Sequence, residues 1–315
     1  MDDGSRMVRT RTCGAWVLPG DPTCAGAARR LFRRVASELA LETEAIDDGI
    51  TMVSELAANT LHASQPQSLT VNPELWLYLR GTGQQAELVC KVFDTFPGWV
   101  RGNVPGRTVC RAPADAMSGR GLEVVHELSS GYWGHHLTRS RLSGTGIRGK
   151  AVWFALPVPA GDAGGKRHPI TARDAMTELE KDLSTRGFSG RLVRADDHAA
   201  DMAVLSIASG LTVWCRSAAA WLRAPGVAAQ QWSYCDLVEV GEQAVQAHEM
   251  IVATADSSFP LVDASRTGSL TELCLRDGKR PVGTEHGRPE AVGVDRGSHP
   301  RVVAGGPREV GYGHP

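Results

Sequence analysis

The sequence predicts an α+β protein, in which a two-layer α/β sandwich is followed by a small α+β domain and a disordered tail. Two observations lead to this prediction. Segments with helical periodicity come first, and short apolar strand-like segments follow with one late helical segment between them. That order is typical of helices packed on an antiparallel sheet. The composition then changes to Gly, Asp, Lys and Pro within 159–169, which indicates a linker.

Four regions follow from these changes in composition. We expect the sandwich over 1–158, the linker over 159–169, the small domain over 170–255 and the tail over 256–315. The tail is rich in Gly, Pro, Arg and His and has few large apolar residues. Such a segment buries too little surface to offset its chain entropy, so we expect it to be disordered.

The charge and the cysteine content indicate in which cellular compartment the protein acts and which class of partner it does not bind. A formal net charge of −1 argues against bulk nucleic-acid binding. The N-terminus lacks the apolar core of a signal peptide, and no apolar run is long enough to span a bilayer. The seven cysteines form no C-x-x-C pair, so we expect reduced thiols and a cytoplasmic protein.

The first elements are a short strand and a helix. The apolar run 15–18 ends at Pro19 and predicts a strand. Asp21 and Pro22 are suited to open the helix that follows. Four arginines, at 29, 30, 33 and 34, indicate a solvated helix face. The alternative is a docking patch for an acidic protein partner.

A second helix over 42–63 carries two polar residues on one face. Its apolar stripe is formed by Ile46, Ile50, Val53, Ala57 and Leu61. Glu55 and Asn59 are four residues apart, so they lie one above the other on a different face. A carboxylate and a carboxamide in this arrangement can bind a hard cation and orient a hydroxyl or water.

The remaining elements of the first domain are strands and one helix. Segments 75–79 and 87–93 read as an antiparallel hairpin, and the second strand ends at Asp94. Residues 99–117 read as a mobile loop. Ser118-Gly-Arg-Gly121 then opens a helix, and 150–156 is a last strand. In the second domain we expect helices over 172–186 and 236–253 and strands at 191–194, 202–207 and 211–215.

Three of these stretches together resemble the Bergerat-fold (GHKL, histidine-kinase-like) ATP-binding family. Glu55-Leu-Ala-Ala-Asn59 is similar to its N-box, Asp94 to its adenine-binding aspartate, and Ser118-Gly-Arg-Gly-Leu122 to its G2 box. The run 53–56, Val-Ser-Glu-Leu, is similar to the actinobacterial ATP-binding regulators related to anti-sigma-factor serine kinases. The resemblance covers roughly 16–157, about half of the chain.

The resemblance implies a role for each matched residue. Glu55 would be the general base, and Asn59 would bind the Mg²⁺ that bridges the phosphates of ATP. Asp94 would accept a hydrogen bond from the adenine amino group. The remaining ATP-binding residues would be His62 after the N-box, Gly98 after the strand, and Ser118, Gly119, Arg120, Gly121 and Leu122 around the phosphates, with 99–117 as the lid.

The sequence departs from the family pattern at two places. Thr95, Phe96 and Pro97 separate Asp94 from Gly98, where the family has Asp-x-Gly-x-Gly. Lys150 and Ala151 follow Gly149, where the family commonly has a threonine before the last strand.

The function that the resemblance implies is that of an ATP- and Mg²⁺-dependent serine/threonine-protein kinase, a transferase that regulates transcription. Its partner would be an anti-sigma antagonist or a sigma factor. The protein would bind neither nucleic acid directly nor a membrane, and it could form a homodimer. The alternative is a non-catalytic module that binds ATP and sequesters a partner. A third reading is a degenerate domain that binds no nucleotide.

Overall fold

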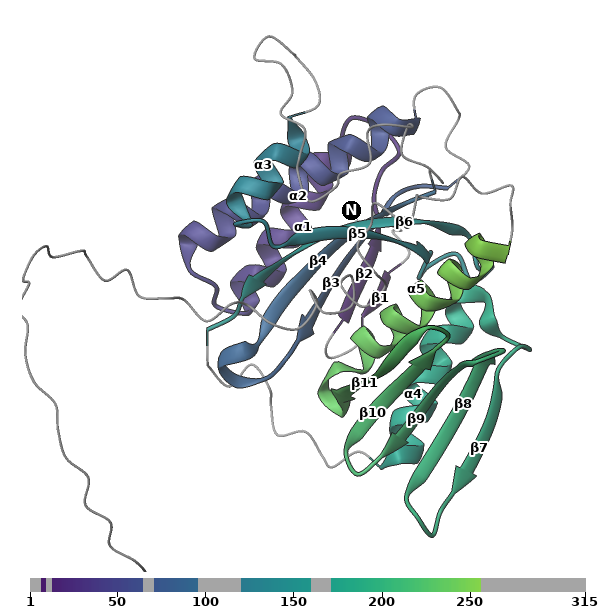
Figure 1. The fold of residues 1–315 in the computed structure, drawn as a ribbon. Helices are drawn as coiled ribbons and strands as arrows, with labels where there is room; N and C mark the ends of the chain where they lie inside the picture. Colours follow the sequence, from purple (N-terminus) through teal and green to yellow (C-terminus); the bar gives the residue numbers. More distant parts are fainter. Residues whose placement is uncertain (1–6, 10–12, 65–70, 96–119, 160–170, 256–315) are drawn as a thin grey trace, which may run out of the picture. The chain divides into compact units, whose positions relative to one another are not determined.

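The computed structural model describes residues 7–9, 13–64, 71–95, 120–159 and 171–255. All of these residues belong to one compact unit, Met1–Asp277. They form five α-helices and two antiparallel sheets (Figure 1), so the α+β class predicted from the sequence is confirmed. Among the described helices, none combines the length and the apolar character that a bilayer crossing requires.

The first sheet has six strands, and every neighbouring pair is antiparallel. In spatial order the strands are β1 (Met7–Arg9), β2 (Cys13–Val17), β3 (Glu74–Arg80), β4 (Glu87–Asp94), β6 (Arg148–Pro157) and β5 (Trp133–Arg139). Three helices lie on one face of this sheet: α1 (Cys24–Glu38), α2 (Thr43–Ser64) and α3 (Gly121–Leu128) (Figure 1). A short 3₁₀ turn, η1 (Gly83–Gln85), lies between β3 and β4.

Alternating side chains separate the two faces of the first sheet. In β4, Leu88, Cys90 and Val92 belong to the core beneath α1 and α2. Val89 and Phe93 belong to smaller clusters on the other face. Because successive side chains of a strand point to opposite faces, Lys91 lies on the face away from the helices, and it is nevertheless only 3% exposed.

The second sheet is a five-stranded meander. Its strands are β7 (Val193–Asp197), β8 (Met202–Ala208), β9 (Leu211–Arg216), β10 (Ala219–Ala224) and β11 (Val227–Ser233). The helices α4 (Ala172–Leu183) and α5 (Leu237–Ala255) share one core with it. Two short helical turns, η2 (Ser184–Phe188) and η3 (Tyr234–Asp236), follow α4 and precede α5. Thr171 and Asp174 form a capping box at the start of α4.

Several sequence predictions differ from the structure in their details. Helix α1 begins at Cys24 rather than directly after Asp21, because the Asp21 carboxylate accepts hydrogen bonds from the backbone and hydroxyl of Thr23 and closes a turn first. The strands β1, β5, β10 and β11 were not predicted. The expected linker, apart from Pro159, and the expected tail lie outside the described residues, so the proposed domain boundaries remain predictions.

The face of the first sheet opposite α1 and α2 packs against α5. The Tyr78 hydroxyl on β3 donates to Glu239 Oε2 at 2.6 Å, and Lys91 Nζ donates to Glu242 Oε2 at 3.2 Å. All four side chains are buried. A burial of this kind requires that each charge meets a partner, because an unpaired ion in a protein interior is strongly destabilising.

Glu242 is the centre of this buried network, with no exposed surface. Arg141 Nη2 lies 2.7 Å from Glu242 Oε1, and Arg186 donates to the same oxygen. Burial alone would raise the pKa of Glu242, but the positive charges of Arg186, Lys91 and Arg141 outweigh it and hold that pKa well below its usual range. Burial, together with Lys91, lowers the pKa of His136, whose Nε2 lies 3.5 Å from Glu242 Oε2.

A second buried carboxylate, Glu249, lies further along α5. Arg139 Nε donates to Glu249 Oε1 at 2.6 Å, and Arg148 from β6 donates to the other oxygen. His248 Nδ1 lies 3.1 Å from Oε1. Burial would raise the pKa of Glu249, but the hydrogen bond from His248 and the charge of Arg139 outweigh it and lower this pKa from 4.5 to about 2.

We predict that Glu242→Gln lowers the free energy of unfolding by about 3–5 kcal/mol, because three buried cations lose their common carboxylate. The control is Glu180→Gln, since Glu180 is 37% exposed and pairs with Arg194 at 3.0 Å. A surface pair of this kind contributes about 1 kcal/mol or less. Urea unfolding of the full chain measures both variants, and equal losses would contradict a special role for Glu242.

We predict a pH dependence that Glu249 causes. Its pKa is lower in the folded chain, so the unfolded chain binds the proton first as the pH falls. The stability from Glu249 is therefore complete above about pH 4.5 and disappears as the pH falls towards about 2. Urea unfolding at several pH values below 5 should show a shallower decline in Glu249→Gln than in the wild type. Parallel curves would show that Glu249 does not carry the effect.

Candidate functional site

Glu55, Asn59 and Gly121 converge in space, although they come from two separate helices. A Cβ atom built on Gly121 would lie 2.6 Å from Glu55 Oε2 and 3.2 Å from Asn59 Nδ2. The helices α2 and α3 that carry them are packed against each other. Only a residue without a side chain fits here unless the Glu55 carboxylate moves.

Local sequence explains why these groups meet. Glu55 and Asn59 are one turn apart on α2, while Val53, Leu56 and Ala57 turn into the core. Both polar residues are half-buried. Gly121 is the first residue of α3, where backbone N–H groups lack partners within the helix. A carboxylate, an amide and a helix N-terminus therefore meet at one point, and N–H groups of this kind bind anions.

Asp94 ends β4 and faces the same side of the sheet as the helices. It is paired with Lys150 of β6 in the strand register. Lys150 Nζ donates to both carboxylate oxygens of Asp94, at 2.6 Å and 2.7 Å. The two side chains lie on the same face of the sheet as Val92 and Val152, which belong to the helix-facing core. The predicted adenine-binding carboxylate is thus held by an ammonium group.

Gly149 allows the close approach of β4 and β6 at this position. A Cβ atom there would lie 2.1 Å from the backbone oxygen of Asp94 and 2.7 Å from the Phe93 ring. No side chain fits against a backbone atom at that distance. The glycine therefore fixes how near Lys150 lies to the end of β4.

The structure places the other predicted site residues as follows. Arg120 is exposed at the N-cap of α3 and makes no side-chain capping hydrogen bond. Leu122 is half-buried against the core. His62 lies within α2, but its side chain is outside the description. Gly98, Ser118 and Gly119, and all of the predicted lid 99–117, lie outside the described residues.

The metal prediction concerns Asn59 alone. In the part of the chain that the structure describes, no group of three or more His, Cys, Asp or Glu side chains could hold a metal ion. Mg²⁺ in nucleotide sites is commonly held by phosphates, waters and one or two protein oxygens. Asn59 beside Glu55 fits such a supporting role and does not fit a metal site built by protein ligands alone.

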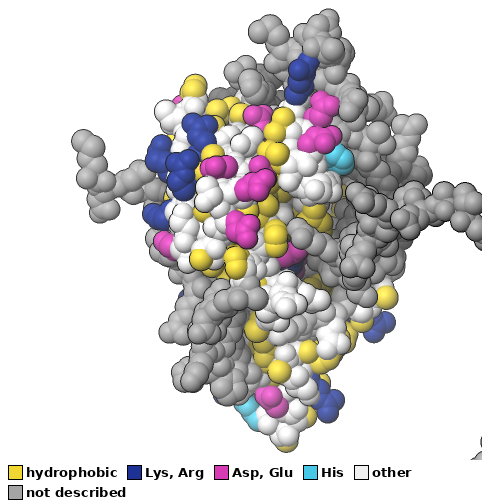
Figure 2. All heavy atoms as spheres, turned by 90° about the vertical axis from the view of Figure 1, so that its left-hand side faces the viewer, with side chains coloured by type: hydrophobic (Ala, Val, Ile, Leu, Met, Phe, Trp, Pro, Cys, Tyr) yellow, Lys and Arg dark blue, Asp and Glu magenta, His cyan; other side chains and the backbone are white. Residues whose placement is uncertain are grey.

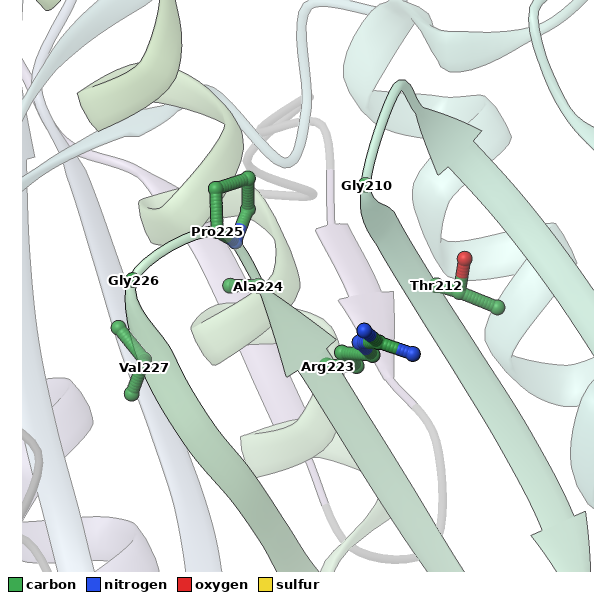
Figure 3. A pocket seen from close by; sticks show the side chains of 7 residues that line it. All are labelled: Gly210, Thr212, Arg223, Ala224, Pro225, Gly226 and Val227. Atoms are coloured by element: carbon green, nitrogen blue, oxygen red, sulfur yellow. The ribbon is translucent and has the colours of Figure 1, made fainter.

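Two surface hollows lie in the second half of the chain, away from these residues. One is formed by two strand turns and lined by Gly210, Thr212, Arg223, Ala224, Pro225, Gly226 and Val227 (Figure 3). The other lies between β10, β11 and α5 and has a volume of about 160 Å³. That is below the roughly 300 Å³ of small-molecule sites. Neither hollow contains a predicted site residue.

The exposed face of α1 is basic. Arg29, Arg30, Arg33 and Arg34 are all exposed, and Figure 2 shows basic side chains gathered on this side of the molecule. The Arg34 guanidinium lies 5.8 Å from the centre of the Trp16 ring, and Arg29 Nη1 lies 3.4 Å from Ser54 Oγ. The solvated face and the docking patch both remain compatible with this arrangement.

The sequence did not predict that Lys150 pairs with Asp94. A lysine directly before an apolar run, Ala-Val-Trp-Phe-Ala-Leu, is a signal that it has a buried partner. The register of β4 and β6, which supplies that partner, is not readable from either strand alone.

No protein-family model matches this chain, and no curated protein matches it. The class of the protein therefore rests on its own fold and site. These are an α+β fold with three helices on one face of a six-stranded antiparallel sheet, and a convergence of Glu55, Asn59 and Gly121 beneath a helix N-terminus.

We predict that Gly121→Ala leaves the fold intact and displaces the Glu55 carboxylate. The Cβ would meet the movable end of a side chain, and Gly121 has an ordinary backbone conformation. Thermal unfolding should show that the variant is destabilised by no more than about 0.5 kcal/mol, because replacing glycine by alanine lowers the conformational entropy of the unfolded chain. Crystallography of the variant should show Glu55 in a new rotamer. An unmoved Glu55 would show that the space at Gly121 is larger than the structure indicates.

Proposed function

We propose that this chain binds Mg²⁺-ATP on the helix-covered side of its first sheet. We further propose that it transfers the γ-phosphoryl group to a serine or threonine of a small regulatory protein. The observation that supports this most is the convergence of Glu55, Asn59 and Gly121. The proposed fold type is the Bergerat ATPase, which the order of helices and antiparallel strands favours.

The phosphates would lie at the start of α3. The N–H groups of its first turn lack helical partners and carry the positive end of the helix dipole, so they stabilise negative charge. Gly121 lets the chain approach an oxygen without a Cβ between them. Asn59, whose amide faces Gly121, would bind Mg²⁺ through its carbonyl oxygen and so connect the metal to the phosphates.

Glu55 would act as the general base. Its Oε2 is the atom nearest to the Cβ position of Gly121, so it points to where the phosphates would begin. A carboxylate there could accept the proton of an attacking hydroxyl as its oxygen bonds to the γ-phosphorus and the bond from that phosphorus to the leaving oxygen of ADP breaks. A correctly placed base contributes about 10²–10⁴-fold to such a reaction.

Asp94 would bind the base of the nucleotide. It lies on the same face of the sheet as the core beneath α2, and it ends its strand. A carboxylate oxygen accepts from the adenine amino group. The expected partners are an anti-sigma antagonist or a sigma factor. We expect the protein to act in the cytoplasm without binding membranes or nucleic acid directly.

The test measures Mg²⁺-ATP affinity by calorimetry and single-turnover transfer from γ-labelled ATP on the full chain. Candidate small antagonist proteins and water serve as acceptors. Asn59→Ala should lose metal-dependent ATP binding. Glu55→Gln should bind ATP nearly as the wild type does, while transfer falls by about 10²–10⁴-fold.

Other outcomes are equally informative. Transfer in Glu55→Gln at the wild-type rate would exclude the general-base role. ATP binding without transfer in either protein would replace the kinase with the second candidate, a non-catalytic ATP-binding module that sequesters a partner. Absence of nucleotide binding in the wild type would overturn the proposed function altogether.

A further inference from the structure

The outer face of the second sheet carries two tryptophans side by side. Trp214 of β9 and Trp221 of β10 are directly opposite each other in the strand register. Their rings are stacked, with 6.1 Å between the ring centres and 7° between the ring planes. Both alternate along their strands with side chains of the core that the sheet shares with α4 and α5, so they lie on the face away from these helices (Figure 1). Both rings are only half-buried.

Two arginines flank the tryptophan pair on the same face. Arg216 lies two residues beyond Trp214 on β9, and Arg223 lies two residues beyond Trp221 on β10. Because β9 and β10 are antiparallel, the two arginines lie at opposite ends of the pair. Both are exposed, and neither forms an ion pair or a hydrogen bond with another residue that the structure describes. Arg223 also lines the hollow at the strand turns, next to Thr212 on the neighbouring strand (Figure 3).

The rest of this face is apolar or uncharged apart from one carboxylate among the described residues. Val193 at the edge is 69% exposed, and Val204 of β8 lies beside Trp214 in the register. The carboxylate is that of Asp197 on the edge strand β7, and it accepts hydrogen bonds from backbone N–H groups of the turn that follows. The face is therefore apolar in its centre and carries an unpaired positive charge at each end of that centre.

We propose that this face binds an extended peptide segment of a partner protein, in which two carboxylates flank an apolar residue. A rise of about 3.3 Å per residue puts each arginine roughly 7 Å from the tryptophan pair along the strands. Side chains on one face of an extended peptide recur every two residues, so the matching pattern is acidic-x-apolar-x-acidic. The carboxylates would accept hydrogen bonds from the guanidinium groups, and the apolar side chain would pack on the indole edges. The inference concerns the second half of the chain and does not depend on nucleotide binding.

Two other occupants match this face less well. A second copy of the chain would bring two arginines and one carboxylate from each side, and like charges facing each other are unfavourable. Single-stranded nucleic acid is also negatively charged, but its bases bind by stacking on free aromatic faces. Here each indole covers one face of the other. An acidic peptide supplies the missing charges without needing a free ring face.

The experiment selects binders from a displayed library of random seven-residue peptides on the full wild-type chain. The counter-selection uses the double variant Arg216→Gln/Arg223→Gln, which keeps the core intact because both side chains are exposed. We expect the peptides that only the wild type retains to carry two acidic residues four positions apart, with an apolar residue midway. A synthetic peptide of the enriched sequence is then measured by fluorescence anisotropy.

Single variants assign the peptide to this face. Arg216→Gln and Arg223→Gln should each weaken binding by about 3- to 10-fold, between the effects of an exposed ion pair and of a charge-assisted hydrogen bond. Trp221→Thr should weaken it by about 10-fold, because the apolar contact is lost. Arg173→Gln removes an exposed arginine from α4, on the other side of the sheet, and should bind as the wild type does. A peptide with glutamine in place of both acidic residues should not bind.

Four results would overturn the inference. The first is a selection in which the wild type enriches no peptide over the double variant, or enriches peptides without the acidic pair. The second is an equal loss of affinity in Arg173→Gln and Arg216→Gln, which would show general charge attraction. The third is oligothymidylate that binds the wild type but not the double variant while no peptide is enriched, which would assign the face to nucleic acid. The fourth is a dimer in sedimentation velocity that the double variant abolishes, which would assign the face to a second copy.

Discussion

The buried carboxylate of Glu242 holds the two halves of this protein together. Its partners come from three separate segments: Lys91 from β4, Arg141 after β5, and Arg186 after α4. A buried ion is tolerated only while its partners remain in place, because removing one leaves the others without compensation. The outer face of the first sheet therefore requires α5, which agrees with the assignment of both sheets to one compact unit.

The two faces of the first sheet have different roles. Apolar side chains fill the core beneath α1 and α2, and Asp94 meets Lys150 on the same face at the end of β4. The opposite face carries the ion pairs to α5. Residues that would bind nucleotide thus lie on one side, and residues that anchor the second half lie on the other.

Much of the fold could be predicted because its periodicity is local. The apolar stripe of α2 and the four-residue spacing of Glu55 and Asn59 depend on that helix alone. Strand β11 was missed because Val-Ala-Ala-Gln-Gln-Trp-Ser has no clear alternation. The contacts that build the site and the buried network join residues that are far apart in the chain. Lys150 is 56 positions from Asp94, and Lys91 is 151 positions from Glu242. No local pattern contains such pairings.

The two charged systems also explain why the sheet can have only one register. Lys91 and Asp94 are three residues apart on β4, so their side chains point to opposite faces. A slip of one residue would turn Lys91 into the apolar core beneath α2 and bring Cys90 or Val92 against the carboxylates of α5. It would separate Asp94 from Lys150 at the same time. The ion pairs that anchor the second half therefore also hold the end of β4 in the position that the proposed site requires.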